Sequence, residues 1–577
     1  MHWYYYAAFA LIAIVILVFV NLRAKREAKV RIKRKIEKQW GNFSEREYHE
    51  GEYSRISFFS DYLDEHPKLK ETLDPDATDS LIDNITWNDL NMDDIFQMMN
   101  TTDSSAGEEV LYYMLRHPFQ KIKAFHRRNE FVESLGKSKE PVLKLKEIFY
   151  YLGRTKSISF CEFVTRLEDM GKLSNRKSYV CLAFLIVAIL ALLISPAVGI
   201  GVLIVAIATN IFQYYSQKAE VEAYFINFHY ISRLVKTAVS LNQSFKESGF
   251  SAMTEQGAAL SERIMQITHT LKPLVGSDRY LDKTNVGDSL SAAILDYVKM
   301  MTHLDLISFK KMATKAIAAK DDILALFYCL GYIESCIAIA SLRQALYFSC
   351  VPEFTKVTNN GIEIEEVYHP LLHQPICNSI STTGCVLLTG SNASGKSTFL
   401  KTVAINTILA QTICTVTATA YKAPFYHIYS SMALRDDICS GESYFIVEIK
   451  SLKRVLDQIN AGQHVLCFVD EVLRGTNTIE RIAASKEILK GFADKGACCF
   501  AATHDIELTK LLDSKYGNYH FSEQIIDGQV VFDYVLHEGP AKTRNAIKLL
   551  KTMNFPQDLV ENAEISARNF LKEGQWT

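Results

Sequence analysis

The chain has 577 residues, which is enough for several domains. Its formal net charge at pH 7 is −2, so bulk charge predicts neither a nucleic-acid partner nor a membrane partner, and either must be inferred from local segments. The 12 cysteines are scattered apart from one adjacent pair and show no C-x-x-C spacing, which argues against a disulfide framework or a zinc site.

The N-terminal segment is strongly apolar. Residues 3–22 form a run of 20 residues without a charge, long enough to cross a bilayer. Residues 23–38 follow with nine Lys and Arg against two Glu. Because positive charge stays inside, the N-terminus is expected outside, with the basic segment in the cytoplasm against anionic lipid headgroups. The alternatives are a cleaved signal peptide, whose usual preceding positive charge is missing here, and a nucleic-acid arm.

A second apolar block covers residues 179–214 and is divided at Ser195-Pro196 into two stretches of about one span each. Basic residues precede the block and Lys218 follows it, so both ends are predicted to be cytoplasmic, with a tight turn outside. A pair of buried core helices is the alternative. The expected location is the cell (inner) membrane, as a multi-pass protein whose remaining chain faces the cytoplasm.

The segments on either side of this block, residues 41–175 and 219–350, are charged and aromatic-rich, and their apolar period predicts helices. The helical spacing is clearest at residues 323–341. Neither segment contains a catalytic motif.

A phosphate-binding motif, G-x-x-x-x-G-K-S, stands between an apolar run at 385–388 and an expected helix at 398–409. Strand, glycine-rich loop and helix is the context that this motif needs, although a chance Gly/Ser-rich turn is the alternative. Lys396 is expected to reach the β- and γ-phosphates of ATP, and Ser397 to hold Mg²⁺. The predicted nucleotide-binding residues are Gly390, Ser391, Asn392, Ala393, Ser394, Gly395, Lys396, Ser397 and Thr398.

Two later apolar runs end in polar residues. Residues 465–469 lead into Asp470 and Glu471, which could otherwise be a simple loop start. At a strand tip, Asp470 can hold Mg²⁺ directly or through water, and Glu471 can orient or deprotonate the attacking water. The run at 498–502 is followed by His504. In ABC-type ATPases a histidine at this place contacts the γ-phosphate or positions the water, so Glu471 and His504 are the predicted catalytic residues.

Ser440 and Gly441 precede a helical pattern, and a helix N-terminus there is suited to an anion. They cannot easily serve the phosphate loop of their own chain as well. In ABC-type ATPases this element completes the site of a second subunit. The resemblance to ABC-type ATPases therefore implies a homodimer with composite nucleotide sites, in which Ser440 and Gly441 bind the partner's ATP.

In their order along the chain, these motifs resemble the ATPase domain of the MutS mismatch-repair family over about residues 362–565. The family motifs H-P-x-x, G-P-N-M-G-G-K-S-T, D-D-L-A-S-G-x-S-T-F-M-V-E, D-E-x-x-R-G-T-S-T and F-A-T-H-x-x-E-L are similar to residues 369–372, 390–398, 436–448, 470–478 and 500–508. A weaker resemblance links residues 85–135 to the start of the family's helical lever domain.

The resemblance implies an α/β ABC-type P-loop ATPase domain with a mostly parallel sheet and an all-α lever, to which the apolar segments add three transmembrane helices. The expected domains are a transmembrane helix (1–22), a basic linker (23–79), a first lever part (80–177), a transmembrane hairpin (178–215), a second lever part (216–354) and the ATPase domain (355–577).

The chain also departs from the family. The mismatch-reading domain, with its F-x-E motif, would precede the lever, where only about 40 residues stand outside the membrane segment. The clamp that closes on DNA is also not recognisable, and Thr543-Arg544-Asn545 replaces the family's S-Y-G. These departures bear on DNA recognition and dimer contacts rather than on ATP chemistry.

Two function classes follow from the resemblance. The first is a membrane-anchored MutS-like ATPase that hydrolyses ATP with Mg²⁺ in a dimer and couples hydrolysis to binding of DNA or mismatched DNA. The second is an ATP-driven switch that acts on a membrane or protein partner without DNA. A conventional transporter is a third and more distant class, because the hairpin offers no charged residue for a substrate path.

Overall fold

The computed structural model describes residues 3–155, 158–168, 174–275, 297–356, 360–391, 394–432, 444–474, 476–526, 529–541, 547, 550 and 555–573. The chain divides into two compact units, which are described separately. Unit 1 comprises Met1–Ala77, Met99–Tyr113 and His126–Ala345, and unit 2 comprises Thr78–Met98, Met114–Phe125 and Leu346–Thr577. Residues 80–98 and 114–125, which the sequence analysis places in the lever, therefore belong to unit 2.

In its described part, unit 1 contains helices and no strands, as the apolar period predicts. Its helices are α1 (Trp3–Gln39), α2 (Glu50–Glu65), α3 (Pro67–Leu73), most of α6 (Ser105–Arg116) and α7 (Ile122–Gly136), α8 (Lys139–Leu152), α9 (Phe160–Arg166), α10 (Arg176–Ile194), α11 (Pro196–Glu247), α12 (Phe250–Met253), α13 (Glu255–Val275), α15 (Leu304–Ala318) and α16 (Lys320–Ala345).

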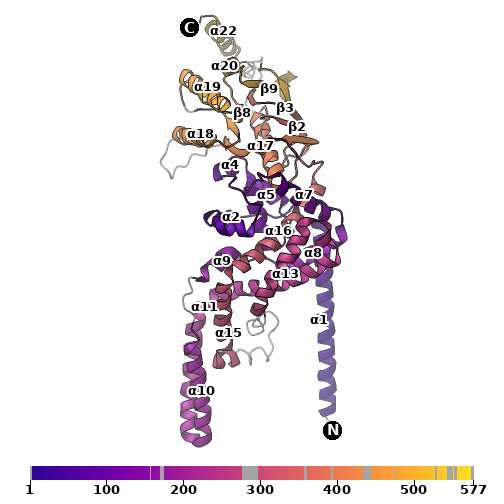
Figure 1. The fold of residues 1–577 in the computed structure, drawn as a ribbon, viewed down its shortest axis with the longest axis vertical. Helices are drawn as coiled ribbons and strands as arrows, with labels where there is room; N and C mark the ends of the chain where they lie inside the picture. Colours follow the sequence, from indigo (N-terminus) through magenta and orange to yellow (C-terminus); the bar gives the residue numbers. More distant parts are fainter. Residues whose placement is uncertain are drawn as a thin grey trace. The chain divides into compact units, whose positions relative to one another are not determined.

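The apolar helix α16 forms the centre of unit 1. By length and composition it could cross a membrane, but its most apolar window is 100% buried within the protein. It packs against α13, α11 and α3 (Figure 1). A helix that is apolar on all sides is stable when other parts of the protein cover it, and α16 is such a buried core helix of unit 1.

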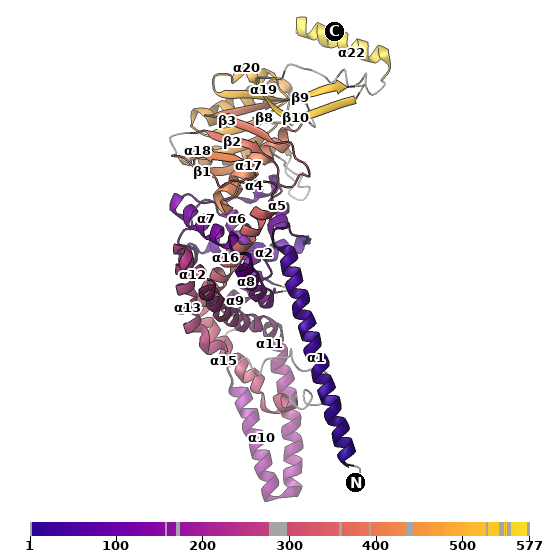
Figure 2. The same ribbon diagram turned by 90° about the vertical axis from the view of Figure 1, so that its right-hand side faces the viewer.

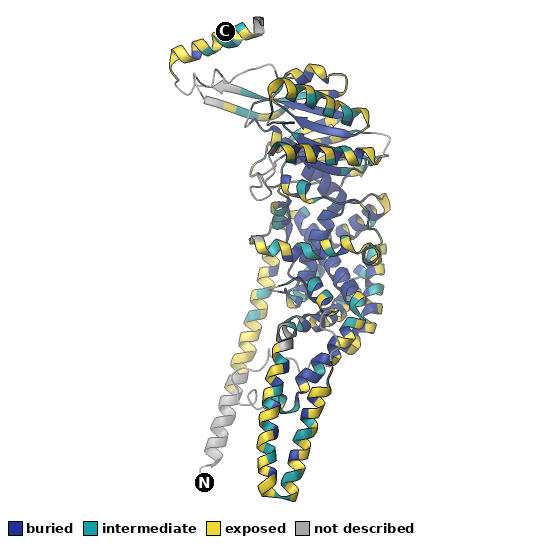
Figure 3. Ribbon diagram, turned by 90° about the vertical axis from the view of Figure 1, so that its left-hand side faces the viewer, coloured by how far each residue is buried: buried dark blue, intermediate teal, exposed yellow. Residues whose placement is uncertain are grey.

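The hairpin formed by α10 and the first part of α11 has the opposite character. Both helices are long and apolar enough to cross a membrane, yet only 17% and 22% of their most apolar windows are buried. Figure 3 shows their surfaces as mostly exposed or partly exposed. The two predicted helices and the break before Pro196 are confirmed, while their insertion into a membrane stays a prediction.

The predicted N-terminal apolar helix is also present, as the first part of α1. Among its described side chains, Ile16, Phe19, Val20 and Leu22 are exposed. Figures 1 and 2 show α1 and the hairpin extending from the same end of unit 1, with the N-terminus and the hairpin turn at their far ends. Exposed apolar residues thus gather on the parts of unit 1 that project furthest from its core.

Unit 2 is an α/β unit with two sheets. A six-stranded sheet has the order β10-β9-β4-β8-β7-β6, in which only the β9–β10 pair is antiparallel. A four-stranded sheet has the order β1-β5-β2-β3. The strands are β1 (Glu353–Phe354), β2 (Ile362–Val367), β3 (Asn378–Thr382), β4 (Cys385–Thr389), β5 (Ala420–Ala423), β6 (His427–Ser431), β7 (Val465–Asp470), β8 (Cys498–Ala502), β9 (Tyr516–Ile526) and β10 (Gln529–Glu538).

Helices cover the six-stranded sheet and bury its core strands, which confirms the predicted mostly parallel α/β arrangement. Alternate residues of β4, β7 and β8 form a core cluster with α18 and α19, and α17 packs against β7 and β8 (Figure 1). Burial on both faces explains why these strands are continuous apolar runs in the sequence. The helices of unit 2 are α4 (Asn84–Asp89), α5 (Met92–Met99), α17 (Lys396–Ile413), α18 (Tyr444–Asn460), α19 (Thr478–Asp494), α20 (Glu507–Leu511) and α22 (Gln557–Glu573).

Candidate active site

The phosphate-binding motif begins where the buried strand β4 ends. Gly390 and Gly395 have φ angles of +146° and +107°, which side chains rarely adopt, so glycine is required at both positions. Helix α17 begins directly afterwards, at Lys396. The strand, loop and helix predicted at residues 385–409 are therefore confirmed, and the first turn of α17 directs its free N–H groups toward the loop.

Lys396 lies across this loop. Its ammonium group donates hydrogen bonds to the carbonyl oxygens of Gly390 (2.8 Å) and Ser391 (2.7 Å), and only 4% of the residue is exposed. Burial lowers the pKa of Lys396, an effect that Asp470 and Glu471 oppose. A desolvated cation whose hydrogen bonds in the described part of the chain go to neutral carbonyl groups is well suited to exchange them for phosphate oxygens.

The two predicted magnesium ligands meet. The Ser397 hydroxyl donates a hydrogen bond of 2.6 Å to Oδ2 of Asp470. The other oxygen, Oδ1, is buried and has no hydrogen-bond partner in the part of the chain that the structure describes. Burial is also the main cause of the raised pKa of Asp470. A hydroxyl beside a carboxylate with one unsatisfied oxygen fits Mg²⁺, which takes few protein ligands together with phosphate oxygens.

The predicted catalytic pair is also assembled. Strands β7 and β8 are parallel neighbours, so their carboxyl ends lie at one edge of the sheet. There, Nε2 of His504 lies 2.8 Å from Oε1 of Glu471, and the guanidinium of Arg474 contacts the other carboxylate oxygen. The hydrogen bond from His504 is the largest cause of the lowered pKa of Glu471. The carboxylate is therefore ionised at neutral pH and able to accept a proton.

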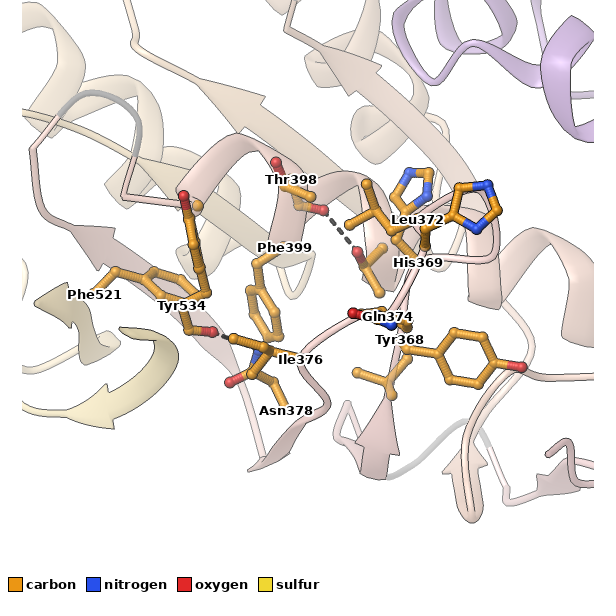
Figure 4. Close-up of a pocket in the computed structure, with 15 residues that line it drawn as sticks. Tyr368, His369, Leu372, Gln374, Ile376, Asn378, Thr398, Phe399, Phe521 and Tyr534 are labelled. Atoms are coloured by element: carbon orange, nitrogen blue, oxygen red, sulfur yellow. Dashed lines mark hydrogen bonds between the residues drawn. The ribbon is translucent and has the colours of Figure 1, made fainter. Parts of the chain in front are cut away.

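A cavity of about 420 Å³ adjoins the loop and the start of α17 (Figure 4). Phe521 and Tyr534, from β9 and β10, lie on one side of Phe399 in this view, and His369 and Leu372 lie on the other. Apolar and aromatic walls beside a phosphate site are suited to a planar heterocyclic base.

The cavity wall is formed in part by the β9–β10 hairpin and by the half-buried His369. Asn378 donates a hydrogen bond of 3.0 Å to the carbonyl oxygen of Tyr534 and accepts one of 2.7 Å from the N–H of Leu536. Burial, with a contribution from Lys401, lowers the pKa of His369 to about 4, so its imidazole is neutral at pH 7. A neutral ring can pack against a base without electrostatic cost.

Several predicted residues lie outside the described residues: Asn392 and Ala393 of the phosphate loop, Ser440 and Gly441, Gly475, and Thr543 to Asn545. The helix expected after Ser440-Gly441 is present as α18, which begins at Tyr444. The described chain thus contains the site's own loop, acids and histidine, while the segment predicted to face a partner's nucleotide is not described.

Three residues that contribute to the site could not be recognised from the sequence. Phe521 and Tyr534 stand on strands that follow the last recognised motif, and no motif or spacing marks them in the sequence. Glu448 ends the motif at 436–448, yet spacing alone gave it no role. In the structure it is buried, and its carboxylate accepts a hydrogen bond from the backbone N–H of Leu473, in the loop after Glu471.

Comparisons with known proteins bear on this site. Residues 386–571 match the family described as MutS domain V. Proteins described as "DNA mismatch repair protein MutS" are similar to the same half of the chain: that of Bacillus subtilis (strain 168) is 32% identical over 38% of this chain and 26% of the relative, that of Bacillus cytotoxicus 34% over 35% and 23%, and that of a Geobacillus species 30% over 37% and 26%.

The chain spans about a quarter of the length of these relatives, and the matched part contains the phosphate loop, the acidic strand and His504. The residues that the structure brings together at the site and the residues that match the family lie in the same stretch of unit 2. Residues 386–571 therefore form a P-loop ATPase domain that matches domain V of the MutS family.

Proposed function

We propose that the protein is a membrane-anchored ATP hydrolase that works as a homodimer. The observation that carries this proposal is the convergence of three groups at one edge of the sheet of unit 2. Lys396 spans the phosphate loop, Ser397 is hydrogen-bonded to Asp470, and Glu471 is paired with His504. These are the parts that phosphoryl transfer to water requires.

Each group has a definite task. Lys396 and the N–H groups of the loop bind the β- and γ-phosphates, and the aromatic cavity takes the base. Ser397 and Asp470 would hold Mg²⁺, which would neutralise charge on the phosphates. Glu471 orients a water molecule and accepts its proton as the water oxygen bonds to the γ-phosphorus and the bond to ADP breaks. His504 fixes the carboxylate in place.

The homodimer follows from the segment that contains Ser440 and Gly441. We assign it to the partner's ATP, so each site uses the loop of one subunit and this segment of the other. Ser440→Arg should leave ATP binding intact and abolish hydrolysis in the homodimer. Mixing it with Lys396→Ala should restore one working site per heterodimer, since each variant damages a different half. A heterodimer that forms but stays inactive would contradict composite sites.

Membrane anchoring accounts for the exposed apolar surfaces of unit 1. The hairpin presents Leu193, Ile194, Phe212 and other large apolar side chains to its surroundings, and α1 adds Phe19 and Leu22. Contiguous apolar surface on this scale is unstable in water and is matched by the acyl chains of lipid. The cell (inner) membrane, with unit 2 and the rest of unit 1 on its cytoplasmic side, satisfies the charge distribution around all three helices.

Coupling to DNA is proposed from the relatives, whose names place them in DNA mismatch repair. The test is the ATPase rate of the detergent-solubilised protein with matched and mismatched duplexes at several salt concentrations. DNA should change the rate, and the effect should weaken steeply with salt because counterions compete for the phosphates. An unchanged rate at low salt would exclude this coupling.

The exposed hairpin favours a second candidate, in which ATP binding and hydrolysis drive a membrane or protein partner without DNA. The hairpin continues into the core of unit 1 as the single helix α11, so a change in the core reaches it directly. ATPase stimulation by lipid vesicles in the absence of any DNA effect would support this candidate over the first.

A further inference from the structure

The loop that follows the acidic strand has an unusual backbone. Glu471 and Leu473 have φ angles of +56° and +58°, in the left-handed region that residues other than glycine seldom occupy. Such conformations persist only where surrounding contacts hold them, and they concentrate at functional sites. The contacts around this loop therefore determine where the carboxylate of Glu471 lies.

Two helices form hydrogen bonds to the peptide group between Val472 and Leu473, one to its N–H and one to its carbonyl oxygen. Oε1 of Glu448, on α18, accepts a hydrogen bond from the N–H of Leu473. The hydroxyl of Ser485, on α19, donates one of 3.2 Å to the carbonyl oxygen of Val472. Val472 and Leu473 also pack into the core cluster of unit 2, so the loop is attached to α18 and α19 by apolar and polar contacts together.

Glu448 is the charged member of this arrangement. Only 5% of the residue is exposed, and burial is the main cause of its raised pKa, against which the backbone N–H groups of Leu473 and Arg474 act. A buried acid is costly unless hydrogen bonds compensate for lost water, and Oε1 of Glu448 has such a bond from the N–H of Leu473. Loss of this acceptor would leave a buried N–H in a strained loop without its partner.

Glu448 also connects two functional segments. It lies in the first turns of α18, which begins at Tyr444, directly after the segment with Ser440 and Gly441. The same side chain holds the loop that positions Glu471 in its own subunit. A shift of α18 on contact with a second subunit would therefore move this loop.

We propose that Glu448 is a positioning residue that sets Glu471 of its own subunit for hydrolysis and links this setting to the docking of α18 against the partner's nucleotide. The second half of this statement rests on the composite site proposed above. The first half stands on the Glu448–Leu473 contact alone and can be tested without a partner-dependent assay.

The first experiment compares variants of one homodimer. Glu448→Ala should lower kcat about 100-fold, the usual effect of a misplacement of about 1 Å, while the Kd for ATP stays within about twofold of the original value. Glu448→Gln should recover most of the rate, since its amide oxygen can accept the same hydrogen bond. Glu487→Ala, at an exposed acid of α19, is the matched control and should change nothing.

The double variant Glu448→Ala/Glu471→Gln tests the route of the effect. If Glu448 acts through Glu471, the double variant should be no slower than Glu471→Gln alone, because the two changes remove one contribution. Additive losses would overturn the proposal. A merely structural role would lower the melting temperature and ATP binding together and would not be rescued selectively in kcat by Glu448→Gln.

Heterodimers isolated through two affinity tags test the subunit assignment. When Glu448→Ala is paired with Lys396→Ala, the sole nucleotide-binding loop belongs to the subunit without Glu448, and the pair should be about 100-fold slower than Lys396→Ala paired with the original chain. When the Lys396→Ala/Glu448→Ala double variant is paired with the original chain, the working loop keeps its own Glu448. That pair should match Lys396→Ala paired with the original chain.

The reverse pattern would show that Glu448 acts in the partner's site and would overturn the proposal. If Lys396→Ala paired with the original chain shows no heterodimer activity at all, the composite dimer is wrong. In that case the homodimer kinetics still decide whether Glu448 positions Glu471. The two failures are thus distinguishable.

Discussion

Replacing Glu471 with glutamine separates ATP binding from hydrolysis. In the structure the carboxylate is bound by His504 and Arg474, and its lowered pKa keeps it ionised at neutral pH. Glutamine preserves the shape and can still accept a hydrogen bond, but it cannot take a proton from water. A positioned general base contributes about 10²- to 10⁴-fold to a rate. The barrier should therefore rise by about 3–5 kcal/mol.

The assay has two readouts. Phosphate release in the steady state should fall by two to four orders of magnitude, while ATP still binds. On size-exclusion chromatography with Mg²⁺ and ATP, the variant should accumulate as the ATP-joined dimer, because hydrolysis no longer separates the subunits. Glu487→Gln, on the exposed face of α19, is the control. Unchanged turnover in Glu471→Gln would show that another group accepts the proton and would refute this assignment.

Three further predictions concern binding, topology and pH. Lys396→Ala should abolish ATP binding or nearly so, because the cation on the β- and γ-phosphates is lost, and retained affinity would contradict the site. A cysteine introduced near Lys38 should resist labelling from outside intact cells, whereas labelling would refute the orientation. Burial raises the pKa of Glu109 in unit 1 from 4.5 to about 8, so stability should fall as pH rises through that window, and Glu109→Gln should flatten this fall in urea unfolding.

Motifs with a fixed local geometry could be read from the sequence. Lys396, Asp470, Glu471 and His504 could be predicted because each stands at or shortly after the end of a buried strand of a parallel sheet, and the ends of neighbouring parallel strands meet. The strand–loop–helix spacing of the phosphate loop is set within about a dozen residues. Short-range spacing of this kind needs no knowledge of the rest of the fold.

Contacts that depend on tertiary packing could not be read in this way. Phe521 and Tyr534 reach the cavity only because β9 pairs with β4, a pairing between strands more than a hundred residues apart. The contact from Glu448 to Leu473 depends on how α18 lies on the sheet. Composition also could not predict the surroundings of α16. This helix is about as apolar as the hairpin helices, but its most apolar window is wholly buried within the protein. Whether an apolar helix meets lipid or protein is decided by its neighbours.

Helix α11 shows how the proposed membrane anchor and the core of unit 1 are joined. Its 52 residues would extend about 78 Å at 1.5 Å per residue. The first part presents exposed apolar side chains such as Val198 and Phe212, whereas the last part buries Phe228, Leu234 and Leu241 in the core. One continuous helix thus runs from the exposed apolar segment into the buried core of unit 1, without a flexible linker between the two parts. A displacement of the core end must therefore tilt or shift the hairpin, so any ATP-driven change that reaches unit 1 is felt at the proposed membrane segment.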